Sequence, residues 1–190
     1  MKWPLKRMKY RIGNYLDLAY LIPMLRRYLV LGTFDGLLTS ISVIVASFLS
    51  NASPHQTISV TLSALIGISA ASAANAFVVE LQEYKKEISR LERQLMKSLK
   101  GTFYVRSMEI SIALLTLVHA MSPFSGLILM VSYLVIRGIT GLILSVAISL
   151  ILLFLMGLIY GTEFVSGAKA GFYMAVSGSV AIFLVAFVLR

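Results

Sequence analysis

The chain has 190 residues, of which 58% are hydrophobic and 13% are charged, and its formal net charge is +9. Soluble domains carry about 25% charged residues, so too few polar side chains are present here to cover a globule in water. The absence of cysteine excludes disulfides, thiolate metal sites and thiol catalysis. We therefore predict an all-α, polytopic membrane protein with the lipid bilayer as its solvent.

The positive charge is concentrated in two clusters. Seven of the 17 Lys and Arg residues lie in 1–27 and seven more in 85–106. Basic clusters that flank apolar segments on one side are typical of cytoplasmic loops of membrane proteins, and this distribution argues against nucleic acid as a partner. We expect 1–27 to be a basic cytoplasmic or interfacial segment, with an amphipathic interfacial helix over 10–27 acting as a structural anchor.

The first predicted span is Tyr28–Leu49, because its 22 residues at 1.5 Å each are long enough to cross the hydrocarbon core. It is longer than the apolar region of a signal peptide, so we expect it to be retained. The second span is predicted over Thr57–Gln82, after a short polar turn that contains Pro54. Its many small residues predict a helix buried among other helices, since they let backbones approach closely.

A short cytoplasmic helical extension is expected over 83–103, and the remaining spans over 104–190. The third span, Tyr104–Val135, contains Pro123, which removes a backbone hydrogen bond and predicts a kink. The fourth and fifth spans are predicted over Ile139–Tyr160 and Ala168–Leu189. A cytoplasmic N-terminus puts both basic clusters on one side, so we predict five spans, N-in and C-out.

Asp35 is the one acid that lies clearly inside a predicted span. A charged side chain at the centre of a bilayer costs about 2.5–3.5 kcal/mol, which makes such residues functional candidates. It lies between Gly32 and Gly36, whose G-x-x-x-G spacing allows a second backbone to come close. We expect that approach to bring Asp35 to a helix–helix seam. Its role there is either functional or that of an acid hydrogen-bonded within the bundle without a ligand.

A second set of candidates lies at the end of the second predicted span. Asn75, Val79, Glu83 and Glu87 recur every four residues and share a helix face, and Glu80 lies one turn before Glu83. Carboxylate and amide oxygens suit hard divalent cations such as Mn²⁺ and Fe²⁺. A solvated cytoplasmic face is the alternative explanation for Glu83 and the ordinary one for Glu80 and Glu87. The candidate metal ligands are Asp35, Glu83, Asn75, Glu80 and Glu87.

Other chemistry has little support in the sequence. His119 and His55 have no second histidine at ligand spacing, so we interpret each as a satisfied or surface histidine. A phosphate-binding G-x-x-x-x-G-K-[ST] loop, an H-E-x-x-H motif and a G-x-S-x-G elbow are all missing. We predict neither an enzyme nor a bound cofactor, and we assign no catalytic residue.

Two motifs resemble the vacuolar iron transporter family. Gly32-Thr33-Phe34-Asp35-Gly36-Leu37-Leu38-Thr39 is similar to the Gly-x-x-Asp-Gly-Leu-x-Thr pattern of that family's first span. Ala74-Asn75-Ala76 through Glu83-Tyr84 is similar to its Ala-Asp-Ala, Met-Gly and Gly-Glu-Tyr pattern at the end of the second span. The five-span layout and the Pro-interrupted third span agree with the family outline. The detailed similarity covers about Arg26–Glu87.

The resemblance implies a homodimer that moves Fe²⁺ or Mn²⁺ out of the cytosol in exchange for protons, along the dimer interface between the first and second spans. It implies that Asp35 is the intramembrane ligand and Glu83 the acid at the cytoplasmic entrance. The chain departs from the pattern at Asn75, where the family usually has an acid, and at Val79, where it usually has a methionine ligand. The long cytoplasmic metal-binding domain of the family is reduced to a short extension.

These departures favour a second hypothesis, a membrane scaffold or regulatory subunit that keeps the fold without an ion path. A lipid-modifying enzyme is a third idea, without a recognisable catalytic constellation to support it. The expected location is a prokaryotic plasma membrane, because the sequence has no cysteine and no targeting segment.

Overall fold

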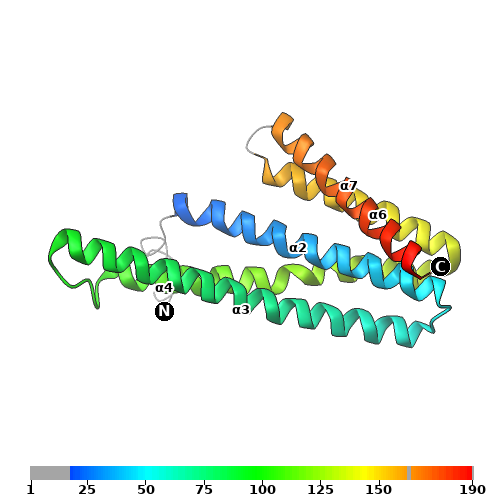
Figure 1. Cartoon of the computed structure of the whole chain (residues 1–190), viewed down its shortest axis with the longest axis horizontal. Helices are drawn as coiled ribbons and strands as arrows, with labels where there is room; N and C mark the ends of the chain where they lie inside the picture. The colour runs from blue at the N-terminus through cyan, green and yellow to red at the C-terminus, as the bar shows by residue number, and fades with distance from the viewer. Residues whose placement is uncertain (1–17, 162–163, 190) are drawn as a thin grey trace, which may run out of the picture.

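The structure is a computed structural model that describes residues 18–161 and 164–189. In this part of the chain all regular elements are helices, and five candidate spans are long and apolar enough to cross a membrane. Figure 1 shows α2 running through the middle of the bundle, with α3 on one side and the α6–α7 pair on the other. The bounds are α2 Leu18–Leu49, α3 Pro54–Leu95, α4 Phe103–Met121, a 3₁₀ segment η1 Ser122–Gly126, α5 Leu127–Ile136, α6 Gly138–Tyr160 and α7 Phe164–Val188.

The first span belongs to a longer helix than we predicted. Helix α2 begins at Leu18, ten residues before Tyr28, and continues through Pro23 without a break. The segment 18–27 is therefore continuous with the span rather than a separate interfacial helix, and 10–17 lies outside the described residues. Farther along α2, the fully buried Leu37 and Ile41 belong to the main apolar core, together with residues of α5 and α6.

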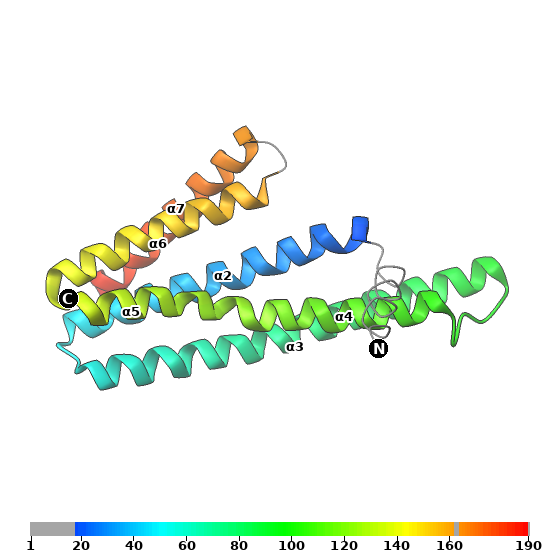
Figure 2. The same cartoon turned by 180° about the vertical axis from the view of Figure 1, so that it is seen from behind.

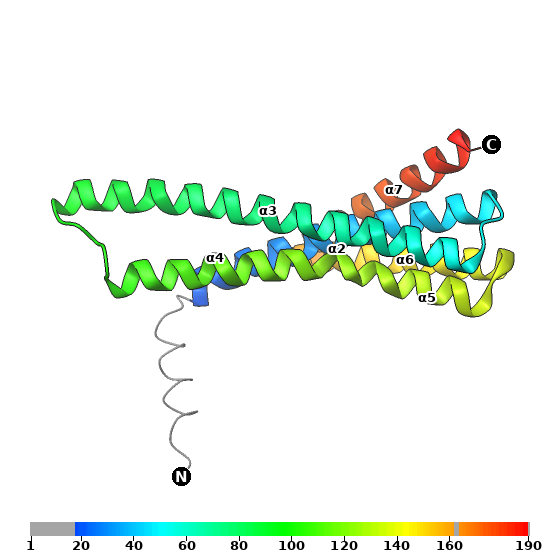
Figure 3. The ribbon, with the colours of Figure 1, turned by 90° about the horizontal axis from the view of Figure 1, so that it is seen from below.

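Helix α3 combines the second predicted span with most of the predicted extension. Ser53 caps its first turn in a capping box with Gln56, and Pro54 occupies the first turn, where a missing N–H costs nothing. Its 42 residues give roughly 63 Å, about twice the hydrocarbon thickness of a bilayer. Helix α3 and the start of α4 accordingly project beyond the start of α2 (Figure 3). The extension, predicted over 83–103, is helical only to Leu95, because Met96 adopts a left-handed C-cap.

The prediction that the small residues bury the second span is wrong for a single chain. Only a minority of the α3 span is covered by the other helices. Gly67 has open space around its Cα, and Ala70 and Ala74 are exposed. The buried face carries Thr57, Thr61, Leu65, Ser72 and Ala76 instead. Small residues permit close packing but do not determine which face is covered.

The third span consists of α4, η1 and α5, which follow one another along the back of the bundle (Figure 2). This span is not α-helical throughout, because residues Ser122–Gly126, which include Pro123, form one 3₁₀ turn. The kink at Pro123 stays a prediction. Pro123 lacks an N–H and so leaves the carbonyl of His119 without its helical partner. The hydroxyl of Ser122 donates to that carbonyl at 3.1 Å.

The last two spans form a tightly packed hairpin. Gly157 of α6 lies against the backbone of Gly171 in α7, where a side chain on either would collide. The turn between α5 and α6 is a single residue, Arg137, which has a positive φ of 51° and is followed by Gly138 at 66°. Large apolar side chains remain exposed along every span, for example Ile66, Val131, Ile143 and Phe183. Such a surface suits lipid, and the chain is a multi-pass membrane protein.

Candidate functional site

Asp35 lies at the middle of α2 with its side chain exposed on the outside of the single chain. The two glycines beside it are buried and face the third span. A Cβ on Gly32 would collide with the side chain of Ser122, and one on Gly36 with the backbone of Pro123. The G-x-x-x-G motif thus packs against η1 within the chain, as its spacing allows.

The expectation that this approach places Asp35 itself in the seam is wrong within one chain. Successive residues of a helix are separated by about 100°, so Asp35 projects roughly 60° from Gly32 and 100° from Gly36. The glycine face is covered by η1, whereas the Asp35 face is left open. An acidic side chain at mid-span is therefore available to a second molecule.

Glu83 and Glu87 lie on the exposed part of α3 and form ion pairs with their own helix. Glu83 Oε1 is 2.7 Å from Lys86 Nζ, and Glu87 Oε1 is 3.8 Å from Arg90 Nη2. The Glu83 side chain is 63% exposed, and Asn75, two turns earlier, is exposed as well. These are the properties of a solvated helix face, the alternative that we considered for Glu83 and Glu87. Pairs of this kind contribute little to stability.

Glu80 differs from the other acids of α3, and the prediction of a solvated face is wrong for it. Its Oε1 accepts a hydrogen bond of 2.6 Å from the hydroxyl of Tyr28 on α2. Tyr28 is buried, and Glu80 is half-buried. The contact joins two helices that are 52 residues apart in sequence.

His119 of α4 extends this contact to a third helix. Its Nδ1 lies 3.0 Å from the carbonyl oxygen of Tyr28, and the two rings are 5.0 Å apart between centroids. The side chain is 8% exposed, which confirms a buried, satisfied histidine. Tyr28, Glu80 and His119 thus form one polar cluster that ties α2, α3 and α4 together.

Sequence reasoning missed this cluster, although two signals pointed to it. His119 precedes Pro123 by four residues, so it is the residue whose carbonyl the proline leaves unbonded. Gly32 follows Tyr28 by four residues on the same helix face, and His119 Nδ1 would lie 3.1 Å from a Cβ on Gly32. A histidine beside a helix break and a glycine opposite it are the residues needed for a close side-chain-to-backbone contact.

In the described part of the chain, no group of three or more His, Cys, Asp or Glu residues is placed to hold a metal ion. The structure brings Glu80 and His119 to Tyr28, while Asp35 lies on the neighbouring, exposed face of α2. Asn75, Glu83 and Glu87 do not converge on Asp35. A complete metal site at Asp35 therefore needs further donors from backbone carbonyls, water or a second copy.

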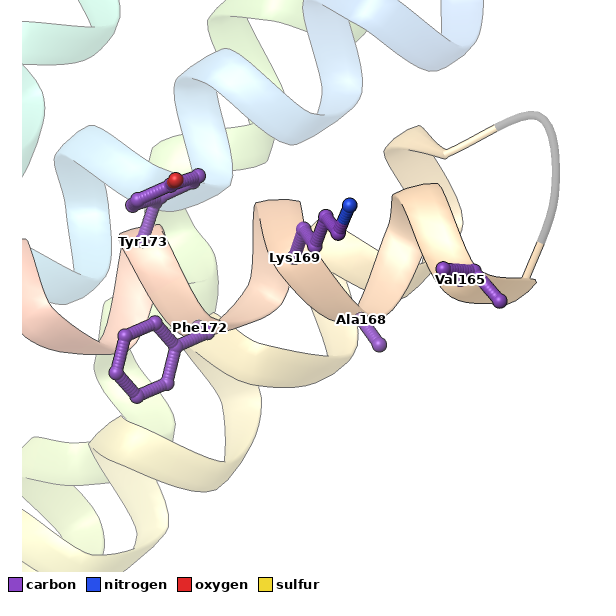
Figure 4. A pocket seen from close by; sticks show the side chains of 5 residues that line it. All are labelled: Val165, Ala168, Lys169, Phe172 and Tyr173. Atoms are coloured by element: carbon purple, nitrogen blue, oxygen red, sulfur yellow. The ribbon is translucent and has the colours of Figure 1, made fainter.

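A separate hollow of about 540 Å³ lies on α7 and contains none of the predicted ligands. It is lined by Val165, Ala168, Lys169, Phe172 and Tyr173. Figure 4 shows Lys169 and Tyr173 on one side of α7, with Phe172 on the other. Lysine and tyrosine next to apolar side chains are typical of the membrane–water interface.

Comparisons with known proteins give no relative from which a function can be transferred. No protein family model matches the chain, and neither a curated protein nor a solved structure is significantly similar to it. The likeness to the vacuolar iron transporters consequently rests on the two motifs, and the geometry of Asp35 and of the polar cluster must carry the functional argument.

Proposed function

We propose that the protein is a transporter of divalent metal cations, Fe²⁺ or Mn²⁺, that works as a homodimer with Asp35 in the ion path. One observation carries the proposal: Asp35 is exposed on the outside of the chain at the centre of a membrane-spanning helix. Facing lipid there costs about 2.5–3.5 kcal/mol. A neutral residue would avoid that cost, so the carboxylate has a partner that a single chain lacks.

A second copy of the chain provides that partner most simply. In a two-fold symmetric interface the same patch of each copy meets its equivalent, so Asp35 approaches Asp35 of the other copy. Two carboxylates at close range repel one another unless a proton or a cation lies between them. A divalent cation between them carries two positive charges and therefore neutralises both carboxylates of the interface.

The outward face of α3 is a further surface suited to close helix association. Small residues follow one another at three- and four-residue spacing along it, namely Ser59, Ser63, Gly67, Ala70 and Ala74, all exposed in the single chain. In lipid, helices associate through such faces because the backbones come close enough for extensive van der Waals contact.

The direction of transport follows from the proposed N-in, C-out topology. The basic residues 85–106 are then cytoplasmic, and metal enters near Glu83, reaches Asp35 and leaves towards the turn 50–56. A carboxylate must lose its proton before it binds a metal. Alternation of Asp35 between its protonated and metal-bound forms therefore couples export to proton entry. A prokaryotic plasma membrane is the proposed location.

A scaffold or regulatory subunit is the second candidate, and one observation favours it. Glu83 and Glu87 are neutralised by Lys86 and Arg90 on their own helix, which weakens an acidic entrance. In this alternative Asp35 serves as a polar anchor for another membrane helix and binds no metal.

Flux of Mn²⁺ and Fe²⁺ into proteoliposomes under an imposed pH gradient tests the proposal. Wild type should transport, and Asp35→Asn should not. Glu109→Gln, the corresponding replacement of a carboxylate by an amide at an exposed position of α4, should retain the wild-type rate. Size-exclusion and thermal unfolding must show that the Asn variant is folded and of unchanged oligomeric state. Flux retained in Asp35→Asn would exclude Asp35 from the ion path. No flux for a folded, dimeric wild type would exclude the transporter and favour the scaffold.

A further inference from the structure

We propose that His119 supplies an imidazole nitrogen to the divalent cation held at Asp35, and that this nitrogen makes the intramembrane site selective for transition metals over Mg²⁺ and Ca²⁺. The inference rests on the proposed function and names the donor set of that same site. Three features of the structure support it: the tautomer that His119 must adopt, its place relative to Asp35, and the contacts that hold its ring.

The hydrogen bond of His119 determines which ring nitrogen carries the hydrogen and which carries the lone pair. Nδ1 lies 3.0 Å from the carbonyl oxygen of Tyr28. A carbonyl oxygen only accepts hydrogen bonds, so Nδ1 carries the hydrogen, and in the neutral ring the lone pair is on Nε2. Histidines that bind metals typically donate their other ring N–H to a carbonyl or carboxylate in this way, which fixes the tautomer and the ring orientation.

The position of His119 brings it close to the Asp35 side of α2. The ring lies against Gly32, since a Cβ on that glycine would be 3.1 Å from His119 Nδ1. Asp35 follows Gly32 by three residues and is its neighbour on the helix surface. Side chains on a helix lean towards its N-terminus, so the Asp35 carboxylate extends over the turn that contains Gly32.

The polar cluster holds the imidazole in place. Tyr28 packs its ring against that of His119 at 5.0 Å between centroids and is itself held by Glu80 through the 2.6 Å hydrogen bond. The hydroxyl of Ser122, the first residue of η1, donates a hydrogen bond to the carbonyl of His119 in α4. Tyr28 and Glu80 are thus positioning residues, because they act on the cation through the orientation of His119.

A carboxylate together with an imidazole has a distinct metal preference. Mg²⁺ and Ca²⁺ take oxygen ligands, whereas imidazole suits divalent transition metals such as Fe²⁺ and Zn²⁺. A neutral imidazole adds a strong donor without adding charge. Two Asp35 carboxylates and two His119 rings from the two copies would give a neutral site around one divalent cation.

Pulsed EPR of Mn²⁺ bound to the full-length protein in nanodiscs tests the proposal directly, because it detects the ¹⁴N nucleus of a coordinated imidazole. The chain contains only one other histidine, His55, which is exposed at the start of α3. Wild type and the matched control His55→Gln should both show ¹⁴N coupling, and His119→Gln should show none.

Equilibrium titration should show Mn²⁺ affinity lowered about tenfold or more in His119→Gln, since loss of even an outer-shell partner costs about 10- to 100-fold. The weaker Mg²⁺ binding should be unchanged.

The outcomes separate this inference from the proposed function. If Mn²⁺ binds in an Asp35-dependent manner and His55→Gln shows no ¹⁴N coupling, the histidine ligand is excluded while the transporter remains. That spectrum decides the matter even if His119→Gln fails to fold. If folded, dimeric wild type binds no Mn²⁺, both the proposed function and the histidine ligand are overturned.

Discussion

Gly36 of α2 and Pro123 of η1 are in backbone contact at the centre of the bundle: a Cβ placed on Gly36 would lie 2.6 Å from the Cα of Pro123. The first span therefore packs directly onto the break in the third span. Because the obstructing atoms belong to a backbone, they cannot move aside as a flexible side chain would. This contact turns the glycine face of α2 towards η1 and leaves Asp35 on the exposed side of the helix.

Gly36→Ala should consequently destabilise the protein. Overpacking a close contact costs about 1–3 kcal/mol, so we expect a lower midpoint of thermal unfolding in detergent. Gly67→Ala is the matched control in a detergent that keeps the chain monomeric, because within a single chain Gly67 has no atom within 4 Å of the position of a Cβ. Alanine is the better helix former, so this control should be as stable as wild type or more stable. Equal midpoints for the two variants would contradict the backbone contact.

Removing the hydroxyl of Tyr28 should loosen the polar cluster. Hydrogen bonds to charged groups contribute about 1.5–3 kcal/mol in water-soluble proteins, and those between membrane helices about 0.6–2 kcal/mol. Tyr28→Phe should therefore lower the free energy of unfolding by about 1 kcal/mol. Tyr173→Phe, at a side chain that is 70% exposed on α7, should have no effect.

A double-mutant cycle of Tyr28→Phe with Glu80→Gln measures the pair itself. The two changes remove the same interaction, so the double variant should lose less stability than the sum of the single variants. Strict additivity would show that Tyr28 and Glu80 are not hydrogen-bonded in the membrane.

The turn between α5 and α6 should respond to substitution with opposite signs at its two residues. Arg137 has a φ of 51°, a conformation that L-residues adopt at a cost of about 1–3 kcal/mol. Arg137→Gly should raise the thermal midpoint by relieving that cost. Gly138, with a φ of 66°, has no atom within 4 Å of a Cβ position, so Gly138→Ala should lower the midpoint through its backbone alone. Shifts of the same sign in both variants would rule out this turn geometry.

Two acids of α3 should differ in structural importance. Glu92 Oε1 accepts hydrogen bonds from the amide of Leu99 at 2.8 Å and from the hydroxyl of Ser98 at 3.2 Å, so it holds the connection to α4. Glu83 forms an exposed ion pair with Lys86 on its own helix. Glu92→Ala should therefore increase hydrogen exchange at the Leu99 amide at least several-fold, whereas Glu83→Ala should leave it unchanged. Identical exchange in both variants would show that Glu92 does not hold this connection.

Much of the fold could be predicted from the sequence, because the lipid solvent restricts the backbone conformations that a membrane-spanning segment can adopt. In a bilayer every backbone polar group must be bonded within its own segment, so each apolar stretch of sufficient length has to be a helix. The fourth span, predicted over Ile139–Tyr160, occupies Gly138–Tyr160 for that reason. The 3₁₀ turn that contains Pro123 reflects the missing N–H of proline and is equally local. The start of α2 at Leu18 was missed, because hydropathy indicates where a helix enters the hydrocarbon core. The backbone hydrogen bonds of the helix extend beyond that boundary.

The sequence by itself determined the helical class, the number of candidate spans and the intramembrane acid Asp35, since each depends on the residues of one segment and their solvent. Only the tertiary structure decided which faces meet. It turned Gly32 and Gly36 towards η1, left Asp35 and the small residues of α3 outside, and brought His119 to the carbonyl of Tyr28, 91 residues away in sequence. In lipid, apolar side chains gain little by contacting one another rather than acyl chains. Hydropathy therefore cannot select the packed face, which is determined by backbone contacts and hydrogen bonds between distant segments.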